Sequence, residues 1–168
     1  MTDTSCPTQS LRSVRAGEPP TNRAGVVTSR LYEGLKQRDR DDIAASFGLR
    51  DNSGAGHGAA LASWMKNLNY IRNACAHHSR LWNRNIDVQL SYRPRTAIPD
   101  LRHAASLTTA KRVYASLAVL AYLMDQVCPG SSWTADITGH IQSGLAAMKR
   151  SDTEMGCPTG WAAEPIWT

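Results

Sequence analysis

The residues best suited to chemistry lie together in one short stretch, residues 68–84, which reads LNYIRNACAHHSRLWNR. It holds a cation, an amide, two imidazoles and two further arginines: Arg72, Asn73, His77, His78, Arg80 and Arg84. Imidazoles exchange protons near neutral pH, and a guanidinium grips phosphate through a planar fork of N–H donors. This set therefore suits phosphodiester cleavage in RNA, where the substrate's own 2′-hydroxyl is the nucleophile and the protein supplies proton transfer and charge stabilisation.

Helix geometry limits how the key pair, Arg72 and His77, can cooperate. Asn73 and His77 are four residues apart and share a helix face. Arg72 and His77 are five apart, which places them about 140° apart around a helix that turns about 100° per residue. They can converge if the helix ends or bends near His77, or if a second copy of the helix completes the site across a two-fold axis.

Two other interpretations of this stretch stay open from the residues alone. Arginine and histidine on a surface helix are usually solvated or hydrogen-bonded structural residues. Cys75 and His78 have an i, i+3 spacing, but the sequence offers no further ligands beside them and no C-x-x-C pair. We therefore expect no metal and no cofactor.

The positive charge of the chain is concentrated around this stretch. The whole chain has a formal net charge of +5. Residues 59–98 carry that same excess, since they hold six basic residues against the one acid Asp87: Lys66, Arg72, Arg80, Arg84, Arg93 and Arg95. Such a stretch is either a surface that binds a polyanion or a solvated basic face without a partner.

Apolar periodicity predicts the helices that must position these residues. In residues 26–37, Val27, Leu31 and Leu35 recur every four residues, as on one helix face, and a short second helix reaches Phe47. A glycine-rich loop follows at residues 51–58. The next helix starts near Ala59. Its apolar residues recur at spacings of three and four, and the last two of them follow the histidines: Leu61, Trp64, Met65, Leu68, Ile71, Cys75, Leu81 and Trp82.

The second half of the chain predicts two more helices. Residues 83–100 are polar and proline-bearing, although the alternation of Val88, Leu90 and Tyr92 allows a short extended segment. A long helix is predicted over 108–127, where Pro129-Gly130 ends it. A last helix, capped by Ser131 or Ser132, has five apolar positions expected to face inward, Trp133, Ile137, Ile141, Leu145 and Met148.

We therefore predict an all-α fold, a small bundle of four to five helices over residues 26–168, with an irregular, aromatic-anchored C-terminal tail. Residues 1–25 are rich in Ser, Thr, Pro, Gly and Arg, and we expect them to be disordered and of low complexity. There is no apolar N-terminal run and no apolar run long enough for a membrane span. We expect a cytoplasmic protein.

The same stretch resembles a known family. Residues 72–77, RNACAH, match the R-x-x-x-x-H signature of the HEPN ribonuclease superfamily, including the Asn that often follows the Arg. The longer run 68–84 resembles the signature of the Abi-like family of bacterial phage-resistance proteins, in which RN-x-x-AHH-x-RLWNR is characteristic. Two later places are similar as well, the Ser132-Trp133 turn and the ending with MG-x-P-x-x-W at 155–161 and PIW at 165–167. The resemblance covers about residues 28–168.

The resemblance implies a HEPN-like helical domain with metal-independent endoribonuclease activity in phage defence or as a toxin. Its site would be composite, formed by two R-x-x-x-x-H motifs; because this chain has one copy, the second must come from a homodimer. Arg72 would bind and polarise the scissile phosphate, His77 would be the acid and base, and Asn73 would orient the phosphate or His77. The weaker candidates for RNA contacts are His78, Arg80 and Arg84. An antitoxin or a guide RNA is a possible further partner that the sequence does not identify, and no membrane partner is expected.

Compared with typical Abi-like proteins, the chain lacks an N-terminal half before this region, so we expect a short form or a fragment. This departure supports a rival interpretation, a non-catalytic helical remnant of the family that binds RNA or a protein. Retention of both Arg72 and His77 favours the enzyme.

Overall fold

The computed structural model describes residues 23–91 and 97–168, and over these residues the chain is all-α, as predicted. It has six α-helices, one of them a single turn: α1 (Arg23–Gly34), α2 (Gln37–Ser46), α3 (Gly58–Ala76), α5 (Leu107–Ala110), α6 (Val113–Val127) and α7 (Trp133–Ala147). Four short 3₁₀-helices accompany them: η1 (Pro99–Ala104), η2 (Asp152–Met155), η3 (Trp161–Ala163) and η4 (Pro165–Trp167). Of the segment 1–25 that was predicted to be disordered, residues 1–22 lie outside the described residues, and residues 23–25 instead begin α1.

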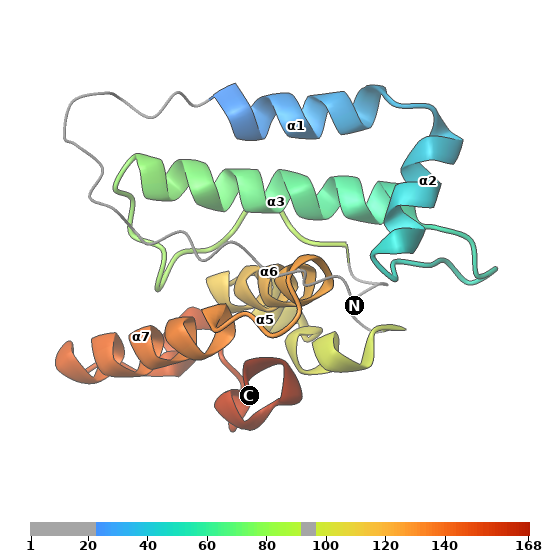
Figure 1. Cartoon of the computed structure of the whole chain (residues 1–168). Coiled ribbons are helices and arrows are strands. Elements are labelled where there is room, and N and C mark those ends of the chain that lie inside the picture. The colour runs from blue at the N-terminus through green and yellow to red at the C-terminus, as the bar shows by residue number, and fades with distance from the viewer. Residues whose placement is uncertain (1–22, 92–96) are drawn as a thin grey trace.

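Helix α3 is the centre of the bundle. Helix α1 runs antiparallel along one side of it, α2 crosses at the start of α3, and α6 packs beneath it (Figure 1). The core around α6 contains several of the largest fully buried side chains, among them Trp64 from α3 and Tyr114 and Val119 from α6. Helix α6 in turn contacts η1 and η4, so the C-terminal turns close the far side of the core.

Helix α1 does not turn its predicted apolar face toward the bundle. Leu31 is 67% exposed and Leu35 is 40% exposed, whereas Ser29 and Tyr32 are buried against the neighbouring helices. The single proton of the Tyr32 hydroxyl is shared between two carbonyl acceptors, Arg40 at 2.9 Å and Gly58 at 3.2 Å. This contact fixes the rotation of α1, because the buried Tyr32 hydroxyl must face α2 and α3 to find a hydrogen-bond acceptor.

The long helix predicted over 108–127 is interrupted. The backbone at Arg112 is extended, with φ −121° and ψ 163°, and separates α5 from α6. Two contacts from the segment after α3 hold this break: the Ile86 N–H donates to the Lys111 carbonyl at 2.9 Å, and Arg112 Nη1 donates to Asn83 Oδ1 at 2.7 Å. Periodicity misses the break, since the partners that stabilise it are more than twenty residues away in the sequence.

The segment after α3 is irregular, and no strand is present in the described part of residues 83–100. An extended segment was predicted at Val88, Leu90 and Tyr92. The structure describes Val88 and Leu90, and these two residues form no paired strand. Instead the backbone carbonyls of Val88 and Gln89 accept hydrogen bonds from the α3 side chains Asn67 and Ser63. The segment thus lies along α3 and is bound by its side chains.

The tail is built around aromatic rings, as predicted. Trp161 and Trp167 are each 3% exposed, and both contact the ring of Tyr114 from α6. Trp167 Nε1 donates to the Tyr114 hydroxyl at 3.0 Å. Burial raises the pKa of Tyr114 well above its ordinary value, so the hydroxyl stays neutral in this core.

Fewer of the apolar residues of α7 are buried than the sequence predicted. Ile141 and Leu145 are buried, and Trp133 and Ile137 pack partly against the core. Met148 is 55% exposed because the helix ends at Ala147, and the prediction that Met148 faces inward is wrong. Within the described residues, no helix is both long enough and apolar enough to cross a membrane.

The predicted glycine-rich loop is present and is hydrogen-bonded. Asp51 Oδ1 accepts bonds from Ser53 and Ala55, and Asp41 Oδ1 accepts the Gly58 N–H at 2.9 Å. Gly56 passes so close to α2 that a Cβ atom there would lie 1.7 Å from the Asp41 carbonyl oxygen. A side chain at this position therefore forces the loop away from α2.

We expect Gly56→Ala to lower the free energy of unfolding by at least about 2 kcal/mol, since the new methyl group meets backbone that has no room to move. Gly139→Ala is the matched control, because nothing lies within 4 Å of a Cβ atom on this residue of α7. In the middle of a helix that change should stabilise by about 0.5–1 kcal/mol. Urea denaturation of both variants measures the difference; equal stabilities would contradict the packing of the loop on α2.

Candidate functional site

Helix α3 ends at the histidine pair, which is one of the two arrangements that the sequence allowed. The His78 N–H donates to the Cys75 carbonyl at 2.9 Å, and the Ser79 N–H donates to the Ala74 carbonyl at 2.8 Å. This pair of bonds is the Schellman arrangement that closes helices. It makes His77 the C-terminal cap and ends the helical run before Leu81 and Trp82, which the periodicity placed on the same helix.

His78 occupies the left-handed position of this cap, with φ 52°. Glycine is the usual residue there because it has no Cβ atom to strain the backbone. A histidine at this φ is uncommon; Lys149 has the same conformation after α7, with φ 53°, so the helix cap accounts for both. The strained turn leaves the side chains of His77 and His78 exposed at the end of α3.

Arg72 lies one turn earlier and faces a different direction. It lines a shallow apolar pocket of about 310 Å³ between α1 and α3, together with Thr28, Met65, Leu68 and Asn69. Its guanidinium also donates to Asn73 Oδ1 at 3.3 Å, a long hydrogen bond. In the part of the chain that the structure describes, no hydrogen bond joins Arg72 to His77. Within one copy, therefore, Asn73 is the member of the predicted set in contact with Arg72.

Asn69 is a polar residue of this pocket that the sequence prediction did not select. Its Oδ1 atom is buried without a hydrogen-bond partner. A buried acceptor of this kind is costly unless a donor reaches it. Because Asn69 and Arg72 are three residues apart on α3, their spacing is the sequence signal that places them side by side.

The two arginines after the histidines contact aromatic rings. Arg80 lies over the ring of Trp82 at 5.5 Å, and Arg150 lies over the same ring at 4.6 Å. Trp82 is thus contacted by two guanidinium groups while it packs partly against the core. Contacts of this kind contribute roughly 0.5–1 kcal/mol at exposed sites.

Arg84 is bound to α3 through Tyr70. Its Nε donates to the Tyr70 hydroxyl at 3.1 Å, and its guanidinium lies 5.7 Å from the centre of the ring. This contact ties the segment after the histidines back to the helix. Arg80 and Arg84 therefore have structural contacts of their own, whereas His77 and His78 project from the helix end.

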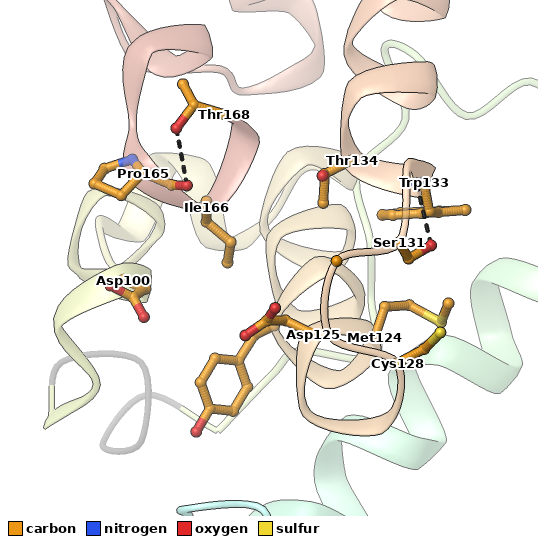
Figure 2. A pocket seen from close by; sticks show the side chains of 12 residues that line it. Asp100, Met124, Asp125, Cys128, Ser131, Trp133, Thr134, Pro165, Ile166 and Thr168 are labelled. Atoms are coloured by element: carbon orange, nitrogen blue, oxygen red, sulfur yellow. Dashed lines mark hydrogen bonds between the residues drawn. The ribbon is translucent and has the colours of Figure 1, made fainter. Parts of the chain in front are cut away.

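A further pocket lies on the opposite side of the bundle. It has a volume of about 280 Å³ and is formed by the end of α6, the start of α7 and the C-terminal turns. Figure 2 shows Asp100 and Asp125 among the side chains around it, with Trp133, Ile166 and Thr168. None of the predicted site residues lines it. Its two carboxylates repel a polyanion, so it is not a suitable place for RNA.

The candidate residues are not arranged to hold a metal ion. Over residues 23–91 and 97–168, no group of three or more His, Cys, Asp or Glu side chains comes together in a way that could bind one. Cys75 is an exposed free thiol on the last turn of α3. The chemistry available at this helix end is that of a guanidinium, two amides and imidazoles.

One comparison with known proteins bears on this region. The family described as Abi-like protein matches residues 26–83, about a third of the chain, which spans α1, α2, α3 and the turn with both histidines. No curated protein and no solved structure shows significant similarity to the chain. The family match supports the resemblance to Abi-like proteins over the segment that carries the candidate site, and it does not extend to the later half.

The contact of Arg84 with Tyr70 predicts a measurable structural role. Arg84→Met removes both the hydrogen bond and the ring contact and should lower the free energy of unfolding by about 1–2 kcal/mol. Tyr70→Phe keeps the ring and should cost about half of that. Arg38→Met on α2 is the control, because Arg38 is almost fully exposed and forms one weak ion pair, at 4.0 Å. If Arg84→Met and Arg38→Met unfold at the same urea concentration, the contact is not structural.

Proposed function

We propose that the chain is an Abi-like, metal-independent endoribonuclease of a phage-defence (abortive-infection) or toxin system, cleaving RNA at a composite R-x-x-x-x-H site of the HEPN kind. The observation that carries the proposal is the end of α3. His77 is presented there as an exposed helix cap, one turn after Asn73 and inside the segment that matches the Abi-like family. An exposed imidazole that is held on a rigid helix end can reach a bound substrate without moving the fold.

The chemistry needs two proton transfers and one cation. An imidazole accepts the proton of the 2′-hydroxyl as that oxygen attacks the adjacent phosphorus, and the bond to the 5′-oxygen breaks. A second proton donor protonates the leaving 5′-oxygen. The products are a 2′,3′-cyclic phosphate and a 5′-hydroxyl end, and the guanidinium of Arg72 stabilises the charge that develops on the phosphate.

A second copy of the chain supplies what one copy lacks. His77 and Arg72 face different directions in a single chain, and a composite site brings two imidazoles and two guanidinium groups together. The exposed Leu31 and Leu35 on α1 adjoin Thr28, so the side of α1 next to the Arg72 pocket is apolar. Covering this side with a second copy would bury the exposed parts of these leucines, a gain below the roughly 1.5–3 kcal/mol expected for a fully exposed side chain, and would place the partner's surface beside the Arg72 pocket.

The first test of the proposal is cleavage without metal. Purified protein in excess EDTA should convert single-stranded RNA to fragments with 2′,3′-cyclic phosphate ends, and a 2′-deoxy residue at the cut should block the reaction. His77→Ala should lower the rate by about 10²–10⁴-fold, and Arg72→Ala by about 10²–10³-fold.

His140→Ala is the matched control, because His140 is an exposed histidine on α7, away from the helix end. It should cleave at the wild-type rate. His77→Ala should keep its RNA affinity while it loses turnover. If the wild-type protein binds RNA and yields no cyclic-phosphate product from a total cellular RNA pool, the non-catalytic interpretation replaces the enzyme.

The second test is complementation between inactive variants. Arg72→Ala and His77→Ala should each be inactive alone and should regain activity when mixed, because a mixed dimer contains one intact His77 opposite one intact Arg72. Adding Leu31→Asp to both variants should abolish the recovery by opening the apolar contact. Light scattering monitors the dimer in parallel; mixtures that stay inactive while the dimers exchange subunits would exclude a composite site.

A further inference from the structure

A second groove lies on α3, nearer the start of the helix than the histidines. Its floor is α3, one wall is formed by α1 and α2, and the other wall is formed by residues 88–89. Its volume is about 440 Å³, and the residues used below are Arg40, Ala59, Ser63, Lys66, Val88 and Gln89. Hydrogen bonds from Ser63 and Asn67 to the backbone of residues 88–89 hold the second wall in place.

The groove combines an apolar floor with a few polar groups, the composition typical of sites for small organic groups. Ala59 and Val88 supply apolar surface, while the hydroxyl of Ser63 and the amide of Gln89 supply hydrogen-bonding groups. The cations are Arg40 and Lys66, and Lys66 is paired with Glu33 at 2.6 Å. The lining therefore keeps an excess positive charge, which comes from Arg40.

Arg40 carries the observation that points to a ligand. Its Nη2 donates to Gln37 at 2.6 Å, but its Nε is buried and has no hydrogen-bond partner. A buried guanidinium N–H without an acceptor is unfavourable, so native structures rarely leave one unpaired. Because this nitrogen is covered in the empty groove, the Arg40 side chain must turn for an acceptor oxygen or nitrogen of a bound molecule to reach it.

The groove and His77 lie on one face of the same helix. Five residues of α3 point their side chains to the same side, because successive members of the set are three, four or seven positions apart: Ala59, Ser63, Lys66, Asn73 and His77. Lys66 and His77 are separated by roughly 16 Å along the axis at about 1.5 Å per residue. A few nucleotides of extended single-stranded RNA can span that distance.

We infer that this groove binds one nucleotide of a single-stranded RNA substrate, a few nucleotides from the phosphate at His77, with Arg40 as its specific hydrogen-bond donor. The inference rests on the proposed function, because it extends the same substrate along the same helix. The base lies on the apolar floor between Ala59 and Val88, where Ser63 and Gln89 meet its polar edge. The guanidinium of Arg40 donates to a base or phosphate acceptor, as it does in nucleic-acid complexes generally. A negatively charged strand suits this groove better than the acidic pocket beside α7.

The test compares two arginines of α2 that carry the same charge. Arg40→Met removes the donor in the groove, whereas Arg38→Met removes a charge that is almost fully exposed and does not line the groove. With a fluorescent, uncleavable 2′-O-methyl RNA dodecamer, Arg40→Met should weaken binding at least about tenfold, the loss expected for a charged hydrogen bond. Arg38→Met should change it less than about twofold. Ala59→Trp, which fills the groove from an exposed position, should weaken binding as Arg40→Met does.

Substrate length separates a binding role from a structural one. For a dinucleotide, which is too short to reach the groove from His77, cleavage by Arg40→Met should equal that of the wild type. For the cleavable RNA dodecamer, its kcat/KM should fall about tenfold. Equal losses in Arg40→Met and Arg38→Met, or an equal loss on both substrate lengths, would overturn the inference. If the wild type cleaves no RNA, the proposed function fails, and the binding comparison still decides whether the groove holds a nucleotide.

Discussion

The contact between Trp64 and Tyr122 fixes the position of α3, and the rest of the structure depends on it. Trp64 is fully buried, and its ring meets the edge of Tyr122 from α6 with the centroids 6.2 Å apart. The Tyr122 hydroxyl then donates to the Phe47 carbonyl at 2.8 Å, which ties the turn after α2 to the same point. A buried indole on one helix is thus locked by a ring whose polar end holds a third element. Because α3 carries both the histidine cap and the groove, this contact sets where both of them lie.

Hydrogen bonds and ring contacts hold the segment after α3 against the helix that carries the candidate site. It runs back along the helix, held by Asn67 and Ser63, and its arginines contact Trp82 and Tyr70. Because these contacts hold the loop at several points, they stabilise the unfavourable left-handed backbone conformation at His78. The same contacts account for part of the basic charge of residues 59–98. Among the predicted site residues, His77 and His78 are the ones that these contacts leave exposed at the helix end.

The exposed apolar side of α1 follows from the position of Tyr32, whereas the separation of Arg72 from His77 follows from their five-residue spacing on α3. Tyr32 sets the rotation of α1 by its shared hydrogen bond, and this turns Leu31 and Leu35 outward. Arg72 lines the pocket between α1 and α3 that adjoins this apolar surface, while His77 lies about 140° away around the helix. Burial of the exposed leucines would favour a partner on this surface, and the proposed composite site would require a second copy of the chain.

The sequence by itself determined the helical class, the start of α3 and the aromatic character of the tail, because these follow from local spacing and from residues such as Trp161 and Trp167 that bury wherever the chain allows. It also determined which residues offer acid–base chemistry, since side-chain type alone decides that. Only the tertiary structure decided the rotation of α1, the break at Arg112 and the exposure of Met148. Each of these depends on a partner distant in sequence, or on where a helix ends. The tertiary structure also showed that Arg40 Nε and Asn69 Oδ1 are buried without hydrogen-bond partners. The sequence cannot show this, because the absence of a partner is known only once the surrounding atoms are placed.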